Sequence, residues 1–427
     1  MITTAAPTSD APTELEMPAP HGSSRTSLST RTLIVHAAAL ALVVGVDGPA
    51  PWAAVRAFVV GGIAAATAWA WHRSSSHAAR WALLAAGLMG VITGVGIGVP
   101  HAVKAGISVE AASGVVALCT GVVLAGIATV SLLRRVRWWT RVAAVPVGIA
   151  ILAFVVAPLT LAVFVTNVPP LELGSRGPAD VDLTAEDVRF RASDGVQLAA
   201  WYVPSTNGAA VVLLGGATNN RSDELDHAAV LARHGYGVLL LDARGHGDSD
   251  GDAMLWGWFG ETDVPAAVDF LSERADVVDG RIGAIGMSMG AEEAIGAAGV
   301  DERIRAVVAE GATARGARDE GDLSTGVGSF LPRYVDWVTS RAADVMTSAP
   351  RPAKLHDAIA AASPRPVMVI AAGTQPAEID AAEVFEAVSP TTVEVWVAEG
   401  AGHTTAYDTD PAAWEARVVG FLDRSLG

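Results

Sequence analysis

The sequence predicts a two-part protein, an apolar all-α bundle followed by an α/β domain whose mostly parallel sheet is covered by helices on both faces. Its 427 residues suffice for about two to three domains. A mean hydropathy of +0.39 is high for a soluble protein. Charge divides the chain: residues 1–171 carry 10 Lys and Arg against 5 Asp and Glu, whereas residues 172–427 carry 19 against 40. The acidic second part repels nucleic acid and excludes it as a partner.

Five apolar stretches predict a transmembrane bundle of about five helices over residues 32–168. The last four are long enough to cross a bilayer, which takes about 20 residues. The first is marginal and is compatible with a short span, a re-entrant segment or a signal-peptide core. Residues 1–31, rich in Ala, Pro, Thr and Ser, predict a disordered tail. The stretches lie near residues 32–48, 51–71, 81–99, 111–133 and 142–166.

Arginine-rich loops predict the orientation of the bundle. The loop at residues 134–141 carries four arginines, and the loop around 72–80 carries two. Loops near 47–51 and 100–110 carry little positive charge. Because basic loops stay in the cytoplasm, the tail is expected to be cytoplasmic. The acidic domain is then expected on the outer side of the cytoplasmic membrane, as part of a multi-pass protein.

A linker at residues 169–186 leads into an α/β domain at residues 187–427. Two alternating segments around Ser193-Asp194-Gly195 predict a β-hairpin. Six apolar strands separated by helical patterns predict a parallel sheet buried on both faces, giving eight strands in all. The hairpin strands are Asp187–Ala192 and Val196–Pro204, and the others are Ala209–Leu214, Gly237–Asp242, Arg281–Gly286, Ile304–Ala309, Pro366–Ala371 and Val393–Val397.

The segment Gly286-Met287-Ser288-Met289-Gly290 ends a predicted strand and opens a helix of small residues. A sharp strand–turn–helix lifts the serine hydroxyl out of the sheet, and flanking glycines let the backbones pass closely. A second copy of the pattern, Gly247-Asp248-Ser249-Asp250-Gly251, has polar turn composition and no such helix after it. We therefore predict Ser288 as a nucleophile and Ser249 as a loop residue.

A histidine follows the last predicted strand, in Gly402-His403-Thr404. The order serine, acid, histidine is the order that nucleophile-elbow hydrolases use. With these features, residues 187–425 resemble the α/β-hydrolase fold and, within it, membrane-associated serine hydrolases of the Bem46-like type. The resemblance rests on the segments VVLLGGATNNRSDELDHAAVLARHGYGVLLLDARGHGDSDG, RIGAIGMSMGAEEAIG, PVMVIAAG and EGAGH.

The resemblance implies a role for each group. Ser288 would attack an acyl carbonyl and His403 would move the proton. The backbone N–H groups of Ala217 and Met289 would bind the oxyanion. The family usually has a histidine where Gly215 stands, but main-chain donors do not require that side chain.

The carboxylate expected to orient His403 departs from the family pattern. The family expects an aspartate a few residues after Gly373, where this chain has Thr-Gln-Pro-Ala. Glu378 is the next carboxylate and is the preferred candidate. Asp380, two residues later, and Glu310, after the preceding strand, are the alternatives.

These observations predict a membrane-anchored serine hydrolase that cleaves ester, thioester or similar acyl bonds of a small-molecule or lipid-like substrate through an acyl-enzyme. A serine aminopeptidase-type peptidase and a catalytically inactive binding protein with the hydrolase fold are the alternatives. An insert near residues 312–362 is expected to cap the site and set substrate choice. No metal or organic cofactor is expected, because Cys119 is the only cysteine and no Cys/His cluster has ligand spacing. The sequence indicates neither the natural substrate nor the oligomeric state.

Overall fold

The computed structural model describes residues 30–45, most of 57–71, 76–316, 319 and 330–427. Nearly all of the predicted tail, the first part of the predicted 51–71 span and a section of the cap insert lie outside these residues.

An eight-stranded sheet forms the core of the C-terminal part, in the order β1-β2-β4-β3-β5-β6-β7-β8. Strands β1, β2 and β4 pair antiparallel, and the remaining pairs are parallel. The predicted α/β-hydrolase fold with a mostly parallel eight-stranded sheet is therefore confirmed. The strands are β1 Glu186–Arg191, β2 Gln197–Val203, β3 Ala210–Leu214, β4 Gly237–Leu241, β5 Ile282–Met287, β6 Ile304–Glu310, β7 Val367–Ala372 and β8 Val393–Ala398.

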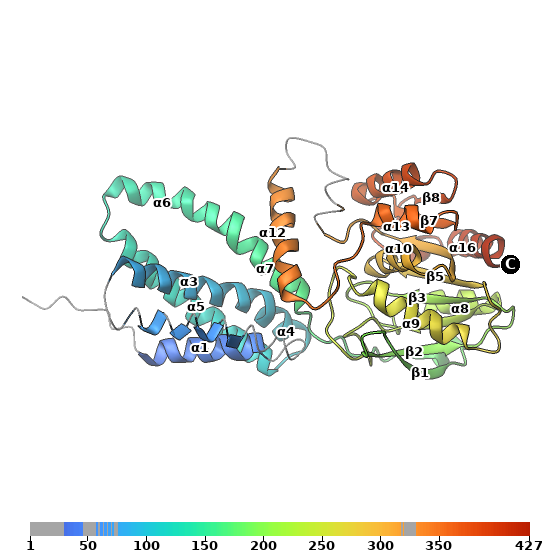
Figure 1. Ribbon diagram of the computed structural model, residues 1–427, viewed down its shortest axis with the longest axis horizontal. Coiled ribbons are helices and arrows are strands. Elements are labelled where there is room, and N and C mark those ends of the chain that lie inside the picture. The colour runs from blue at the N-terminus through green and yellow to red at the C-terminus, as the bar shows by residue number, and fades with distance from the viewer. Residues whose placement is uncertain are drawn as a thin grey trace, which may run out of the picture.

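Helices cover both faces of this sheet (Figure 1) because successive side chains of each strand point to opposite sides. In β3, for example, Val212 packs into the core on one face, and Val211 packs into the core on the other. The first face is covered by α9 Gly260–Ser272, α10 Met289–Val300, α13 Leu355–Ala362 and α14 Pro376–Val388. The second is covered by α8 Leu225–Arg233, α15 Ala406–Thr409 and α16 Pro411–Leu426.

Within the described residues of the N-terminal part, three helices are long and apolar enough to cross a membrane, namely His77–Lys104, Val109–Leu133 and Trp138–Thr166. The marginal first stretch forms the 16-residue helix α1, and the described part of the 51–71 stretch contains a shorter apolar helix, Val60–Trp69. Two of the long helices have internal π turns. The elements are α1 Thr30–Gly45, α3 His77–Thr93, η1 Gly94–Gly98, α4 Val99–Lys104, α5 Val109–Leu133, α6 Trp138–Ile151, η2 Leu152–Val156 and α7 Ala157–Thr166.

Small residues let α3, η1 and α5 pack backbone to backbone. A Cβ on Gly98 would lie 2.6 Å from the backbone of Gly114, and one on Gly87 would lie 2.5 Å from the amide nitrogen of Ala125. Close approach through glycine is typical of helix packing in membranes, where apolar burial contributes little to association.

The α/β part sits at one end of the bundle, and the helix α12 (Phe330–Met346) lies between them (Figure 1). The Thr339 hydroxyl of α12 donates to the Pro158 carbonyl of α7, at 3.2 Å. Val165 of α7 and Ala343 of α12 share a buried apolar cluster with Trp258, which follows β4. The insert between β6 and β7 thus touches the bundle as well as the α/β domain.

Candidate active site

Ser288 stands between β5 and α10, in the sharp turn that the sequence predicts. Its φ of +53° and ψ of −117° are strained for a residue with a side chain. Glycine is required on both sides of it. A Cβ on Gly286 would lie 2.1 Å from the Gly290 carbonyl oxygen, and one on Gly290 would lie 2.6 Å from the carbonyl oxygens of Leu214 and Gly215. The turn therefore holds the half-buried serine in a fixed orientation.

His403 lies in the loop after β8 and contacts Ser288, although 115 residues separate them along the chain. The Ser288 Oγ lies 2.8 Å from His403 Nε2, and His403 Nδ1 lies 2.7 Å from Glu378 Oε1. In the tautomer that protonates Nδ1, the ring donates to Glu378 and accepts from the serine. The second oxygen of Glu378 accepts from the Ala372 N–H at 2.8 Å, so this buried carboxylate is fixed at both ends.

The hydrogen bond with Glu378 raises the pKa of His403 above its usual 6.5, against the opposing effect of partial burial. About half of the histidine side chain is exposed. A histidine in this position can accept a proton from an adjacent hydroxyl and return it to a leaving group.

The two alternative acids lie elsewhere. Asp380 is exposed on α14. Glu310, at the end of β6, is buried and accepts from the Ala406 N–H at 2.9 Å and from the Trp414 indole N–H at 3.2 Å. Glu310 therefore holds the segment that follows His403, whereas Glu378 contacts the ring itself.

The residues predicted to bind an oxyanion flank Ser288. Met289 is the first residue of α10, so its N–H has no acceptor within the helix. Ala217 follows Gly216, where an added Cβ would lie 3.5 Å from the Ser288 Cβ. The ring of His246 lies 3.1 Å from the Ala217 carbonyl oxygen, which fixes this turn. Both backbone segments thus lie close to Ser288.

The other copy of the glycine–serine pattern has a different environment. Ser249 is buried, and its Oγ donates to the Asp242 carbonyl at 2.8 Å and accepts from the Ala199 N–H at 2.8 Å. The Asp242 carboxylate accepts from the Arg221 backbone and side chain. These contacts join the loops after β3 and β4.

Two buried glutamates on α10, the helix that follows Ser288, were not among the predicted site residues. Glu292 accepts from the Thr313 and Ala314 N–H groups, at 3.2 and 3.0 Å. Burial raises the pKa of Glu292 and of Glu293 to about 8. Their signal in the sequence is a pair of adjacent carboxylates in a helix otherwise made of small and apolar residues.

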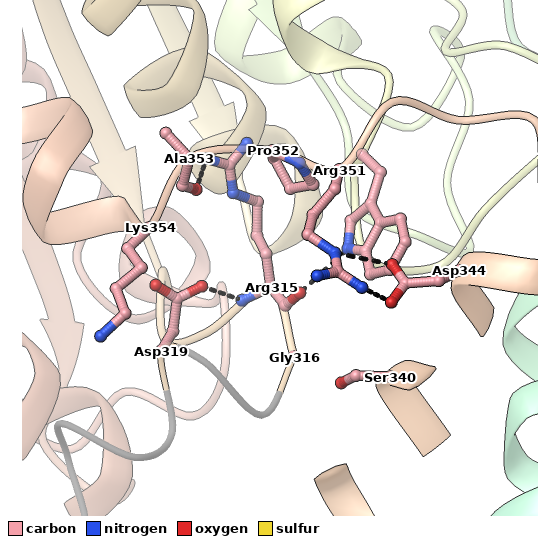
Figure 2. A pocket seen from close by; sticks show the side chains of 10 residues that line it. Arg315, Gly316, Asp319, Ser340, Asp344, Arg351, Pro352, Ala353 and Lys354 are labelled. Carbon is pink, nitrogen blue, oxygen red and sulfur yellow. Dashed lines mark hydrogen bonds and ion pairs between the residues drawn. The ribbon is translucent and has the colours of Figure 1, made fainter. Parts of the chain in front are cut away.

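A cavity of about 30 Å³ separates α12 from the α/β domain (Figure 2), with room for about two water molecules. Ser340 and Asp344 line it from α12, and Arg315 lines it from the loop after β6. Arg315 also pairs with Glu261 at 2.8 Å. Neither Ser288 nor His403 lines this cavity. Within the described ranges, no group of three His, Cys, Asp or Glu residues is placed to hold a metal ion.

The model of the X-Pro dipeptidyl-peptidase (S15) family matches residues 194–417, slightly more than half of the chain. The chain belongs to this family. It is therefore a hydrolase of the α/β-hydrolase superfamily, and the match includes the serine, histidine and glutamate described above.

Individual relatives match shorter segments of the chain than the family model does. The Escherichia coli K12 protein YfhR, described as uncharacterized, is 29% identical over 156 residues, which are 35% of this chain and 54% of YfhR. The Arabidopsis thaliana α/β-hydrolase domain-containing protein WAV2 is 32% identical over 117 residues, which are 26% of this chain and 37% of WAV2. The Aspergillus aculeatus thiohydrolase aneE is 30% identical over 135 residues, which are 29% of this chain and 41% of that protein. The chain thus spans about half or less of the length of these relatives.

Among solved structures, the Pyrococcus furiosus esterase Pf2001 is similar with a TM-score of 0.49 and 25% identity. The similarity covers 61% of this chain and 99% of the esterase.

Proposed function

We propose that this protein is a membrane-anchored serine hydrolase of the Bem46-like type that cleaves ester or thioester bonds through an acyl-enzyme on Ser288. The observation that carries the proposal is the hydrogen-bonded chain from Ser288 Oγ through His403 to Glu378, with distances of 2.8 and 2.7 Å. It is the arrangement that nucleophilic catalysis by serine needs.

In the proposed reaction the Ser288 oxygen attacks the acyl carbon while its proton passes to His403 Nε2. Glu378 keeps the ring in the productive tautomer and stabilises the imidazolium. The N–H groups of Ala217 and Met289 bind the oxyanion of the tetrahedral intermediate. Collapse expels the leaving group, which takes the proton from His403. A water molecule then repeats the sequence on the acyl-enzyme and releases the acid.

Membrane anchoring by several spans is part of the proposal. Three long apolar helices support it. The arginines of residues 134–141 lie at the turn between α5 and α6, at the end of the bundle away from the α/β domain (Figure 1). Because basic loops remain cytoplasmic, the hydrolase domain would face the outer side of the cytoplasmic membrane.

The test is hydrolysis by the purified full chain in detergent, with short p-nitrophenyl esters as substrates. We expect turnover that is lost in Ser288→Ala, with kcat reduced roughly 10⁶-fold, and kept in the matched control Ser249→Ala. Wild-type protein without any ester turnover would contradict the proposal and favour an inactive binding domain.

A peptidase is the second candidate, and the family match is the observation that favours it. The same protein should be assayed with X-Pro and aminoacyl p-nitroanilides. A kcat/KM for an anilide above that for every ester would replace the esterase assignment by the peptidase assignment.

A further inference from the structure

The edge of the sheet that carries Ser288 and His403 is the edge that faces the apolar bundle. Val165, in the last turn of α7, accepts from the Leu255 N–H in the loop after β4, at 3.1 Å. The linker continues along the same edge, where Leu171 accepts from Gly247 N–H at 2.7 Å. Both contacts are made by loops at the carboxyl ends of strands, where the candidate site also lies. The opposite, amino edge of the sheet points away from the bundle.

The side chains of helix α12 have three kinds of surroundings. Thr339 and Ala343 are buried against α7 and its neighbours. Ser340 and Asp344 face the polar cavity (Figure 2). The exposed side carries apolar and basic side chains: Phe330, Trp337 and Val345 are 70%, 55% and 65% exposed, and the exposed Arg333 and Arg341 lie between them at helical spacing.

This exposed face is continuous with a membrane-length helix. The ring of Tyr334, on the same side of α12, packs edge to face on Phe154 at 5.3 Å between centroids. Phe154 lies within the apolar helix Trp138–Thr166. Leu152 and Val155 of that helix are also exposed. Lipid that surrounds the long helix therefore also meets α12.

The depth of α12 in the membrane follows from counting residues along the helix Trp138–Thr166. Trp138 and Trp139 are exposed at its start, next to the arginine-rich turn, which is typical of a membrane interface. About 20 residues cross the hydrocarbon layer, so the opposite boundary falls near residue 158. Pro158 is the residue that accepts the hydrogen bond from Thr339 of α12. In Figure 1 the axis of α12 runs across the axes of α3 and α5. If α3 and α5 cross the membrane as proposed, α12 runs along the membrane plane near the boundary of the hydrocarbon.

We infer that α12 lies flat in the membrane interface with Phe330, Trp337 and Val345 in lipid, and that the active site takes a long-chain acyl ester from the bilayer. The inference rests on the proposed function and on the proposed membrane anchoring. A helix that exposes aromatic side chains together with arginines is the type that binds at this depth. The cavity beneath α12 has room for only about two waters and does not hold an acyl chain. We therefore place the acyl chain among the lipids, with the ester group at Ser288.

The first experiment measures the position of α12 directly. In a Cys119→Ala background, Trp337→Cys or Val278→Cys carries an environment-sensitive NBD fluorophore, and the full chain is reconstituted in phosphatidylcholine vesicles. Val278 is the matched control because it is 53% exposed, like Trp337, but precedes β5 at the amino edge of the sheet. We expect blue-shifted emission and quenching by shallow doxyl lipids at position 337 alone. Equal, unquenched emission at both positions would overturn the interfacial placement.

The second experiment separates the substrate class from the reaction. Wild type, Trp337→Glu and Val278→Glu are assayed with soluble p-nitrophenyl butyrate and with p-nitrophenyl palmitate in the same vesicles. We expect Trp337→Glu to lower palmitate turnover at least tenfold, to leave butyrate turnover unchanged, and Val278→Glu to change neither. Equal palmitate turnover in all three proteins would overturn the inference and leave the esterase assignment intact. Absence of butyrate turnover in wild type would count against the proposed function itself.

Discussion

Two buried glutamates contact the segment that carries His403, one from the first turn of α14 and one from the end of β6. Glu378 lies 2.7 Å from the ring nitrogen Nδ1. Glu310 instead accepts the backbone N–H of Ala406 and the indole N–H of Trp414. Both carboxylates are thus buried and close to the loop of His403, but they contact different atoms. A carboxylate that contacts the imidazole can control its tautomer, whereas one that contacts backbone and indole can only fix where the loop lies.

Position along α14 explains how Glu378 reaches His403 although the expected aspartate is missing. The helix begins at Pro376, so Glu378 is in its first turn, where the helix dipole favours a negative charge. Its longer side chain returns to the Ala372 N–H and to the ring of His403. Asp380 is also on α14 but is exposed.

Replacement of Glu378 tests the difference between the two glutamates most strongly. Glu378→Gln should reduce kcat by about 10⁴-fold, because an amide does not hold the Nδ1 proton in the productive tautomer. The matched control Asp380→Asn should retain wild-type kcat. Steady-state ester kinetics on folded protein would check both, and equal losses in the two variants would assign the acid elsewhere.

The pH dependence of kcat/KM also tests the contact between Glu378 and His403. Because the Glu378 hydrogen bond raises the pKa of His403 above 6.5, kcat/KM should rise with pH through a midpoint above that value. The neutral histidine is the active base, so protonation at lower pH removes activity. In Glu378→Gln the midpoint should shift to lower pH. A midpoint unchanged between wild type and variant would show that the two groups are not coupled.

Glu310 should affect stability more than rate. Glu310→Gln weakens two buried hydrogen bonds, and the free energy of unfolding should fall by about 1–3 kcal/mol. Its kcat should fall far less than that of Glu378→Gln. Urea unfolding and ester kinetics on the same preparations would measure both. A loss of kcat as large as that of Glu378→Gln, with unchanged stability, would reverse the roles given to the two residues.

A third buried glutamate, Glu293, extends the comparison because it lies on α10, the helix that follows Ser288, and has no hydrogen bond to His403. Burial raises its pKa from 4.5 to about 8, so the folded state binds its proton more tightly than the unfolded state. The free energy of unfolding should therefore decrease as pH rises from 4.5 to 8. Glu293→Gln should raise stability at pH 8 by more than about 1 kcal/mol, with little change at pH 4.5. Thermal unfolding at the two pH values checks this, and a destabilised variant at pH 8 would contradict it.

Local pattern was enough to predict the sheet and the placement of Ser288 and His403. Apolar strands alternating with helical segments specify a parallel sheet, and parallel strands bring their carboxyl-end loops to one edge. The choice among Glu378, Asp380 and Glu310 needed coordinates, because all three follow neighbouring strands and only the direction of each side chain separates them. The position of α12 could not be predicted from the sequence either, since its contact with α7 joins residues 181 positions apart. The insert predicted near residues 312–362 occupies the connection between β6 and β7, and its contacts reach the bundle as well as the α/β domain.

The most direct measurement treats the full-length protein with a fluorophosphonate probe and maps the adduct by mass spectrometry. The account predicts a single modified residue, Ser288, with labelling lost in Ser288→Ala, strongly slowed in Glu378→Gln and retained in Ser249→Ala. An adduct on another residue, or labelling that survives in Ser288→Ala, would contradict it.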